Sequence, residues 1–131
     1  MQELAVDVAI IGAGTAGLSA FKEASKVTDK IVLIDHGPLG TTCARVGCMP
    51  SKTLIQTANY FHNKVYLSEL GIDGADGLKV DPERVMKHVR TLRDYFTSST
   101  IQYIKSLGNK FIQGGATFIE KNKLSITHPA A

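Results

Sequence analysis

Both cysteines of the 131-residue chain lie in one short stretch, CARVGCMPSK, as Cys43 and Cys48 with four residues between them. Such a pair can be a structural staple, part of a metal site or a redox couple. A structural zinc site needs four ligands, and the four histidines show no paired spacing that would complete a set. The sequence therefore predicts no metal site. It leaves a redox pair, which we favour, and two unrelated buried thiols as the alternative.

A disulfide between Cys43 and Cys48 sets a condition on the backbone. In a regular helix, residues five apart have Cα atoms about 8.6 Å apart, whereas a disulfide requires less than about 7 Å. The bond therefore requires a helix that starts irregularly or is distorted between the two cysteines. Gly47 and Pro50 favour such an irregularity, because glycine relaxes the backbone and proline removes an intrahelical hydrogen bond. A strained disulfide of this kind is readily reduced, which suits catalysis better than stapling.

The charges around the cysteines also favour redox chemistry. Lys52 follows Cys48 by four residues, on the same face of a helix. Arg45 lies between the cysteines, and a helix N-terminus there would add partial positive charge. Positive surroundings stabilise the thiolate, which is the reactive form of cysteine.

A second candidate site is a glycine-rich turn near the start of the chain. The apolar run Leu4 to Ile11 has the composition of a buried parallel strand, and GAGTAG follows it at residues 12–17. A helix should follow the turn and end before Thr28, and IVLI at residues 31–34 should form the next strand. Asp35 stands at the tip of that strand, 18 residues after the last glycine. Strand, glycine turn, helix, strand and acid together predict a dinucleotide-binding site.

Each residue of this turn has an expected role. Gly12 permits the tight turn, Gly14 lets the backbone approach a pyrophosphate, and Gly17 allows close helix–strand packing. The helix N-terminus offers free N–H groups to the phosphates, and the carboxylate of Asp35 would accept hydrogen bonds from an adenosine ribose. The alternative is a turn that serves packing only. The glycines alone do not distinguish FAD from NAD.

The rest of the chain predicts helices and short strands. Leu54, Ala58, Phe61 and Val65 follow a helical period, so one face of that helix should be buried. Asp81 should cap a long helix that begins at Pro82 and ends at Gly108. Short strands are expected at residues 111–112, 116–119 and 124–126, the last two as a hairpin. The expected fold is α/β: a partial Rossmann-like domain of parallel strands and helices with a small β-hairpin.

Composition restricts the class of protein. The length fits one domain, the hydrophobic content is 44%, and the net charge is +3, as in a soluble globular protein without nucleic-acid partners. The basic stretch of residues 84–93 should be a solvated helix face. No signal peptide and no run of about 18 apolar residues is visible, so we expect a cytoplasmic protein without membrane contact. In that reducing compartment a persistent structural disulfide is not expected.

The stretch Gly40 to Lys52, GTTCARVGCMPSK, resembles the redox-active disulfide signature of the flavoprotein disulfide reductases. That family includes dihydrolipoamide dehydrogenase, glutathione reductase and mercuric reductase. The resemblance covers the whole chain, including the spacing from the glycine turn to the cysteines and the segment GGATF at residues 114–118. Two positions depart from the usual pattern: Thr41 stands where a second glycine is usual, and Asp35 stands where glutamate is more usual.

The resemblance implies FAD as the cofactor of the glycine turn. Cys43 would be the thiol that exchanges with the substrate's sulfur, Cys48 would lie against the flavin as the charge-transfer thiolate, and Lys52 would tune the flavin. The cofactor-binding residues that the resemblance implies are Gly12, Gly14, Thr15, Ala16, Gly17, Asp35, Thr41, Thr42, Lys52, Gly115 and Ala116.

The resemblance also implies that residues 1–131 are the N-terminal segment of an FAD-binding domain. The NAD(P)-binding domain and the dimer-interface domain of the family are expected outside this chain, so the piece alone should be inactive and the full-length enzyme a homodimer. The wording of the signature is most like dihydrolipoamide dehydrogenase, with a small dithiol or a lipoyl-protein as substrate. Alternatives are a glutathione or mercuric reductase-like enzyme, a non-catalytic dinucleotide-binding module, and a small metal-binding or scaffold domain.

Overall fold

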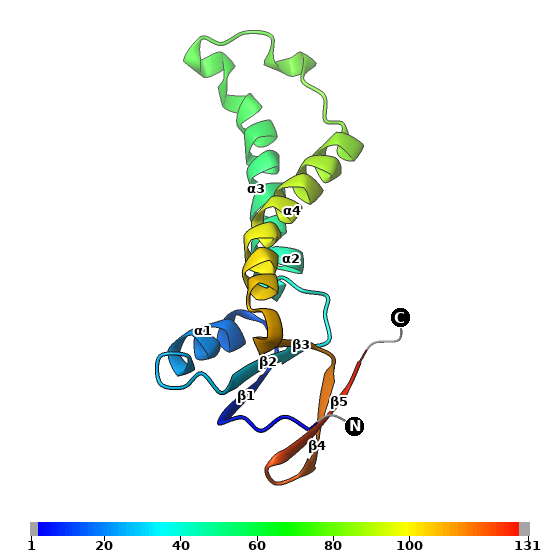
Figure 1. Ribbon diagram of the computed structural model, residues 1–131. Coiled ribbons are helices and arrows are strands. Elements are labelled where there is room, and N and C mark those ends of the chain that lie inside the picture. Colours follow the sequence, from blue (N-terminus) through cyan, green and yellow to red (C-terminus); the bar gives the residue numbers. More distant parts are fainter. Residues whose placement is uncertain (1–2, 129–131) are drawn as a thin grey trace. The chain divides into compact units, whose positions relative to one another are not determined.

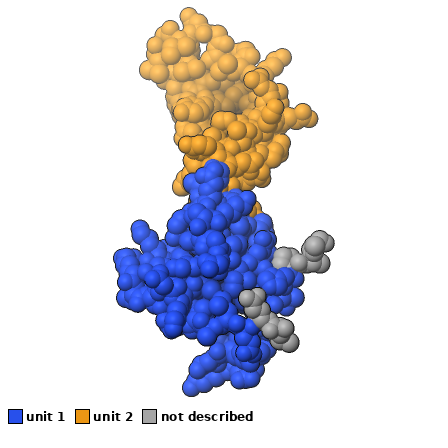
Figure 2. All heavy atoms as spheres, in the orientation of Figure 1, with its two compact units in different colours: residues 1–42, 98–131 blue, residues 43–97 orange. Residues whose placement is uncertain are grey.

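The computed structural model describes residues 3–128 of the chain. The length predicts one domain, and the structure contains two compact units (Figure 2). The first unit comprises residues 1–42 and 98–131, and the second comprises residues 43–97. The glycine turn therefore belongs to the first unit and both cysteines to the second.

The first unit is built on a three-stranded parallel sheet (Figure 1). Its strands are β1 (Val8–Ile11), β2 (Ile31–Asp35) and β3 (Phe111–Gln113), with β2 in the middle. Helix α1 (Thr15–Ala24) connects β1 to β2, so the predicted order of strand, turn, helix and strand is confirmed. Parallel pairing places the carboxyl ends of all three strands at one edge of the sheet.

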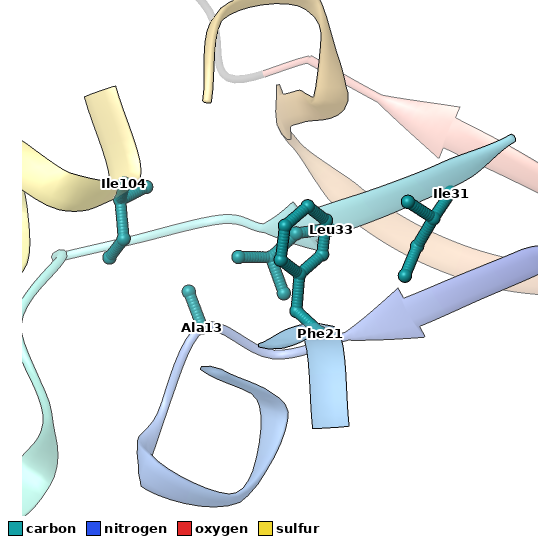
Figure 3. Packing of buried hydrophobic residues seen from close by; sticks show 5 residues of the cluster. All are labelled: Ala13, Phe21, Ile31, Leu33 and Ile104. Atoms are coloured by element: carbon teal, nitrogen blue, oxygen red, sulfur yellow. The ribbon is translucent and has the colours of Figure 1, made fainter. Parts of the chain in front are cut away.

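The core of this unit explains why β2 has a continuous apolar sequence. All four residues of IVLI are buried, because β2 has a strand on each side and side chains packed on its faces. Phe21 of α1 and Ile104 of helix α4 (Pro82–Ser106) pack with Leu33 in one cluster (Figure 3). The central strand thereby fixes Asp35, its last residue, at the edge where the three strands end.

Strand β1 is shorter than the sequence predicts. It begins at Val8 and not at Leu4, whose side chain is 62% exposed. The reason is where its partner strand starts. β2 begins at Ile31, and the hydrogen bond that precedes the β1–β2 pairing runs from the N–H of Asp7 to the carbonyl of Lys30. The described residues that precede Asp7, residues 3–6, have no strand paired with them, and apolar sequence alone does not extend a ladder.

The predicted hairpin is confirmed. Strand β4 (Gly115–Glu120) pairs with β5 (Lys123–Thr127) in an antiparallel register that brings Ala116 opposite Ile126. Gly114 precedes the hairpin and is buried. A Cβ at this position would lie 2.6 Å from Cγ2 of Ile126 and 2.9 Å from the carbonyl oxygen of Thr127. Only glycine therefore lets β5 approach the end of β3 this closely.

The second unit is helical. Helix α2 (Thr42–Val46) leads into it, α3 (Cys48–His62) follows, and three 3-10 turns come next: η1 (Asn63–Tyr66), η2 (Ser68–Leu70) and η3 (Ala75–Gly77). Helix α4 begins here and ends in the first unit, before η4 (Gly108–Lys110). Asp81 caps α4 as predicted, because its Oδ1 accepts hydrogen bonds from the N–H groups of Glu83 and Arg84 at 3.1 Å.

The prediction of a buried face on α3 is wrong for the described residues. Leu54 is 44% exposed, Phe61 36% and Val65 54%. Val65 also lies outside the helix, because α3 ends at His62. Periodicity identifies an apolar stripe but does not show what covers it. Among residues 3–128, no helix combines the length and the apolar character that crossing a bilayer requires.

Candidate functional site

An open cleft of about 440 Å³ lies at the carboxyl edge of the sheet in the first unit. The ends of β1 and β2 and the segment that follows β3 all contribute to it. Its lining residues are Ile11, Gly12, Ile34, Asp35, His36, Gly114, Gly115 and Ala116. Ligands of open α/β sheets bind at this edge, beyond the carboxyl ends of the strands. The cleft therefore has the position of a nucleotide site.

The glycine turn approaches the sheet closely. Gly12 has φ +102°, in the left-handed region that favours glycine, and its N–H donates to the carbonyl of Ile34 at 2.7 Å. A Cβ on Gly17 would lie 1.8 Å from the carbonyl oxygen of Gly12, so no side chain fits there. Gly17 thus permits the close approach of α1 to the turn, in agreement with the role predicted for it.

The start of α1 has the features of an anion-binding site. Gly14 precedes the helix and has no side chain that could cap its N-terminus. The first turn contains no acidic residue. The first helical bond runs from the N–H of Leu18 to the carbonyl of Gly14, so the N–H groups of Thr15, Ala16 and Gly17 precede the intrahelical ladder. A Cβ on Gly14 would meet no atom within 4 Å. Open space and free N–H groups together fit the pyrophosphate of a dinucleotide such as FAD.

Asp35 has a structural task in addition to its predicted one. Its Oδ2 accepts a hydrogen bond from the N–H of Ala13 at 2.6 Å, and its Oδ1 accepts one from the N–H of Gly37 at 2.6 Å. The carboxylate thus ties the glycine turn to the loop after β2. Its hydrogen bond to a ribose stays a prediction.

The two cysteines lie on either side of a break between two helices. Helix α2 ends at Val46 and α3 begins at Cys48, with Gly47 between them at φ −119° and ψ −115°. The irregularity predicted from Gly47 and Pro50 is therefore present. Both cysteines are exposed free thiols, and their side chains are joined by a hydrogen bond. The prediction of two unrelated buried thiols does not describe this pair.

The contact between the thiols changes the acidity of Cys43. The hydrogen bond to Cys48 raises the pKa of Cys43 above its ordinary value of 9.0, and the slight shielding of Cys43 from water and the charge of Cys48 add to this. A hydrogen bond from the backbone N–H of Cys48 and then the positive charge of Lys52 lower the same pKa, but by less. In the reduced pair, Cys43 therefore keeps its proton to higher pH than an isolated cysteine does.

This balance predicts the pH dependence of alkylation. Only the thiolate reacts, so in the reduced chain the midpoint for alkylation of Cys43 by iodoacetamide should lie above pH 9.0. Cys48→Ala removes the hydrogen bond and should move the midpoint down toward 9.0, whereas Lys52→Gln should move it up. Peptide-resolved mass spectrometry of alkylation rates measures all three. A midpoint unchanged by Cys48→Ala would contradict the contact between the thiols.

Among residues 3–128, no group of three or more histidine, cysteine, aspartate or glutamate side chains is arranged to hold a metal ion. The second unit therefore presents its cysteines as a pair of thiols, accompanied by the exposed Lys52 four residues further along α3.

Comparison with known proteins identifies the family. The sequence model of the pyridine nucleotide-disulphide oxidoreductases matches residues 6–127, which is nearly the whole chain. The chain belongs to the pyridine nucleotide-disulphide oxidoreductase family. This agrees with the resemblance carried by the cysteine signature and the glycine turn.

Several similar members of the pyridine nucleotide-disulphide oxidoreductases are dihydrolipoyl dehydrogenases. That of Mycoplasma genitalium is 32% identical over 122 residues, which cover 93% of this chain and 27% of that protein. One from Bacillus subtilis is 30% identical over 120 residues and covers 91% of this chain and 26% of its own length. The chain thus spans about a quarter of the length of the curated relatives it matches.

Solved structures of the family confirm the fold. The chain resembles the Cu(II) complex of the HOCl-induced flavoprotein disulfide reductase RclA from Escherichia coli with a TM-score of 0.68 and 22% identity, over 92% of this chain and 24% of that one. The complex of its C43S mutant gives a TM-score of 0.72 at 22% identity, over 97% and 25%. The parallel sheet with its hairpin is therefore the FAD-domain part of the flavoprotein disulfide reductase fold.

The predicted site residues of this chain fall into four places. Gly12, Asp35, Gly115 and Ala116 line the cleft together, and Gly14, Thr15, Ala16 and Gly17 form the turn and the start of α1. Cys43, Cys48 and Lys52 belong to the second unit. Thr41 and Thr42 lie just before and at the start of α2, outside the lining of the cleft.

Sequence reasoning did not single out three residues that line the cleft: Ile11, Ile34 and His36. Their positions at the strand ends could have identified them. Ile11 and Ile34 are the last apolar residues of their strands, and His36 directly follows the acid at the strand end. Any residue that ends a parallel strand next to a glycine turn is a candidate to line the ligand site at that edge of the sheet.

Proposed function

We propose that this chain supplies the FAD-binding and redox-active disulfide part of an oxidoreductase that passes electrons between NAD(P)(H), FAD, a Cys43–Cys48 disulfide and a dithiol or disulfide substrate. The observation that carries the proposal is the pair of exposed free thiols on either side of the helix break at Gly47. Membership of the pyridine nucleotide-disulphide oxidoreductases supports it. The NAD(P)-binding and interface domains, and the partner of a homodimer, belong to the proposal as parts outside this chain.

FAD, when bound, exchanges hydride with a nicotinamide and two electrons with a dithiol. The residues that would hold it are those of the glycine turn and the cleft: Gly12, Gly14, Thr15, Ala16, Gly17, Asp35, Gly115 and Ala116. They provide N–H groups for phosphate and a largely apolar cleft. We assign Thr41, Thr42 and Lys52 to the same cofactor on the strength of the family resemblance.

The chemistry of the cysteines is thiol–disulfide exchange. A thiolate of a dithiol substrate attacks the sulfur of Cys43 in the disulfide, forming a mixed disulfide and releasing Cys48 as a thiolate. The second thiolate of the substrate then attacks its own sulfur in the mixed disulfide, leaves as a cyclic disulfide and releases Cys43. Two electrons have moved to the cysteines, and Cys43 takes up a proton that it shares with Cys48 by hydrogen bond.

Dihydrolipoamide is the substrate that we favour. The similarity to dihydrolipoyl dehydrogenases over more than nine-tenths of the chain supports this choice, and it implies a lipoyl-protein or a small dithiol as partner. A glutathione or mercuric reductase-like enzyme is the alternative with the same pair of cysteines.

Reduction of the oxidised chain by dihydrolipoamide tests the proposal. The control is a synthetic peptide of residues 40–52, GTTCARVGCMPSK, with its own disulfide. In the folded unit the cysteines lie on α2 and at the start of α3, near positive charges. We therefore expect the chain's disulfide to be reduced roughly tenfold faster than the peptide's. Mass spectrometry of the alkylated thiols measures both rates. A chain that forms no internal disulfide, or one that resists dihydrolipoamide, would contradict the redox function.

A further inference from the structure

The cleft contains two side chains that can form hydrogen bonds, those of Asp35 and His36. The other lining residues are glycine, alanine and isoleucine. Both carboxylate oxygens of Asp35 already accept backbone N–H groups, from Ala13 and Gly37. His36 is exposed and lies on the loop that those bonds fix in place. Beside the Asp35 carboxylate, the imidazole of His36 is therefore the second polar group that the cleft offers to a ligand.

The surroundings of His36 suit a flat ring. The apolar residues Ile11, Ile34 and Ala116 line the cleft, and Asp35 contributes a carboxylate. A dinucleotide whose pyrophosphate lies at the start of α1 places its ribose beside the acid at the end of β2. The adenine base attached to that ribose would then lie in the cleft that His36 lines.

We propose that His36 is a base-binding residue of the cleft, whose imidazole ring stacks on the adenine of the bound dinucleotide. The inference rests on the proposed cofactor site and adds the group that recognises the base. An imidazole has an aromatic face, and purines have one too, so stacking needs no fixed hydrogen-bond pattern. Asp35 is by contrast a positioning residue for the turn, through its bond to Ala13.

The experiment measures binding of two ligands to the 131-residue chain and to three variants. AMP has the base, and ribose 5-phosphate has the same sugar and phosphate without it. His36→Ala should weaken AMP binding about tenfold, which is typical when a side-chain ring that stacks on a base is removed. His36→Phe keeps a ring without the ring nitrogens and should stay within about threefold of wild type, whereas His36→Gln should resemble His36→Ala. Binding of ribose 5-phosphate should be the same in all four proteins, by isothermal titration calorimetry.

The outcomes separate this inference from the proposed function. Tight AMP binding that His36→Ala leaves unchanged overturns the role of His36 and leaves the nucleotide site standing. Equal losses in His36→Phe and His36→Ala overturn stacking as its basis. A wild-type chain that binds neither AMP nor FAD overturns the nucleotide site, and the inference with it, while the dihydrolipoamide test of the cysteines stands by itself. His36 is exposed, so unchanged thermal unfolding should accompany each substitution.

Discussion

Cys48→Ser should trap a mixed disulfide on Cys43 that the wild-type chain resolves at once. With one equivalent of dithiodipyridine, the first thiol displaces one pyridinethione and keeps the other as an adduct. In the wild-type chain the neighbouring thiolate attacks that adduct, so both of the chain's thiols are consumed and two pyridinethiones leave. In Cys48→Ser the attacking group is absent, and the adduct persists.

The expected difference is large because the attack within the chain has a high effective concentration. The two side chains are already in hydrogen-bond contact, so the second release should be on the order of 10³-fold faster than attack by a millimolar external thiol. Absorbance of the released pyridinethione gives the rates, and intact mass identifies the adduct. Serine is close to cysteine in size and Cys48 is exposed, so the fold should be unaffected.

Cys43→Ser is the matched control, because it should trap the adduct on Cys48 in the same way. If the two thiols acted independently, the wild-type chain would keep its adduct as both variants do. That result would remove the redox pair and leave two unconnected reactive cysteines. The test needs no flavin, so it examines the cysteines alone.

The parts of the structure that the sequence predicts are those set by local physics. The alternation of an apolar run, glycines, a helix and IVLI predicts parallel strands, because a crossover helix leaves no other arrangement. The break between the cysteines follows from Gly47, whose backbone leaves the helical conformation. The capping of α4 by Asp81 follows from the side chain's own oxygen and nearby N–H groups.

The parts that the sequence did not predict depend on which segments pack against one another. The length of β1 is decided by where β2 begins, and β2 begins at Ile31. The apolar stripe of α3 has a helical period, yet Leu54 and Phe61 are exposed in this chain. Asp35 was predicted as a ribose ligand from its place at the strand end, but its bond to Ala13 depends on how closely the turn packs.

Gly17→Ala should unfold the first unit more readily and abolish nucleotide binding. The new Cβ would lie 1.8 Å from the carbonyl oxygen of Gly12 and 3.0 Å from its carbonyl carbon. Backbone must move to make room, which separates α1 from the turn and costs about 3 kcal/mol of unfolding free energy. The same movement disturbs the N–H groups at the start of α1. Denaturant unfolding and calorimetric binding of ADP and FAD measure the two effects.

Gly14→Ala is the control that separates folding from binding. Its φ of −77° is ordinary for alanine and its Cβ would meet no atom within 4 Å, so stability should change by less than about 1 kcal/mol. If a diphosphate lies against this backbone, the added methyl group occupies its space, and binding of ADP and FAD should fall at least about tenfold. Unaltered FAD binding in Gly14→Ala would place the diphosphate elsewhere. Unaltered stability in Gly17→Ala would show that α1 and the turn have room for a Cβ, contrary to the distance of 1.8 Å between that Cβ and the carbonyl oxygen of Gly12.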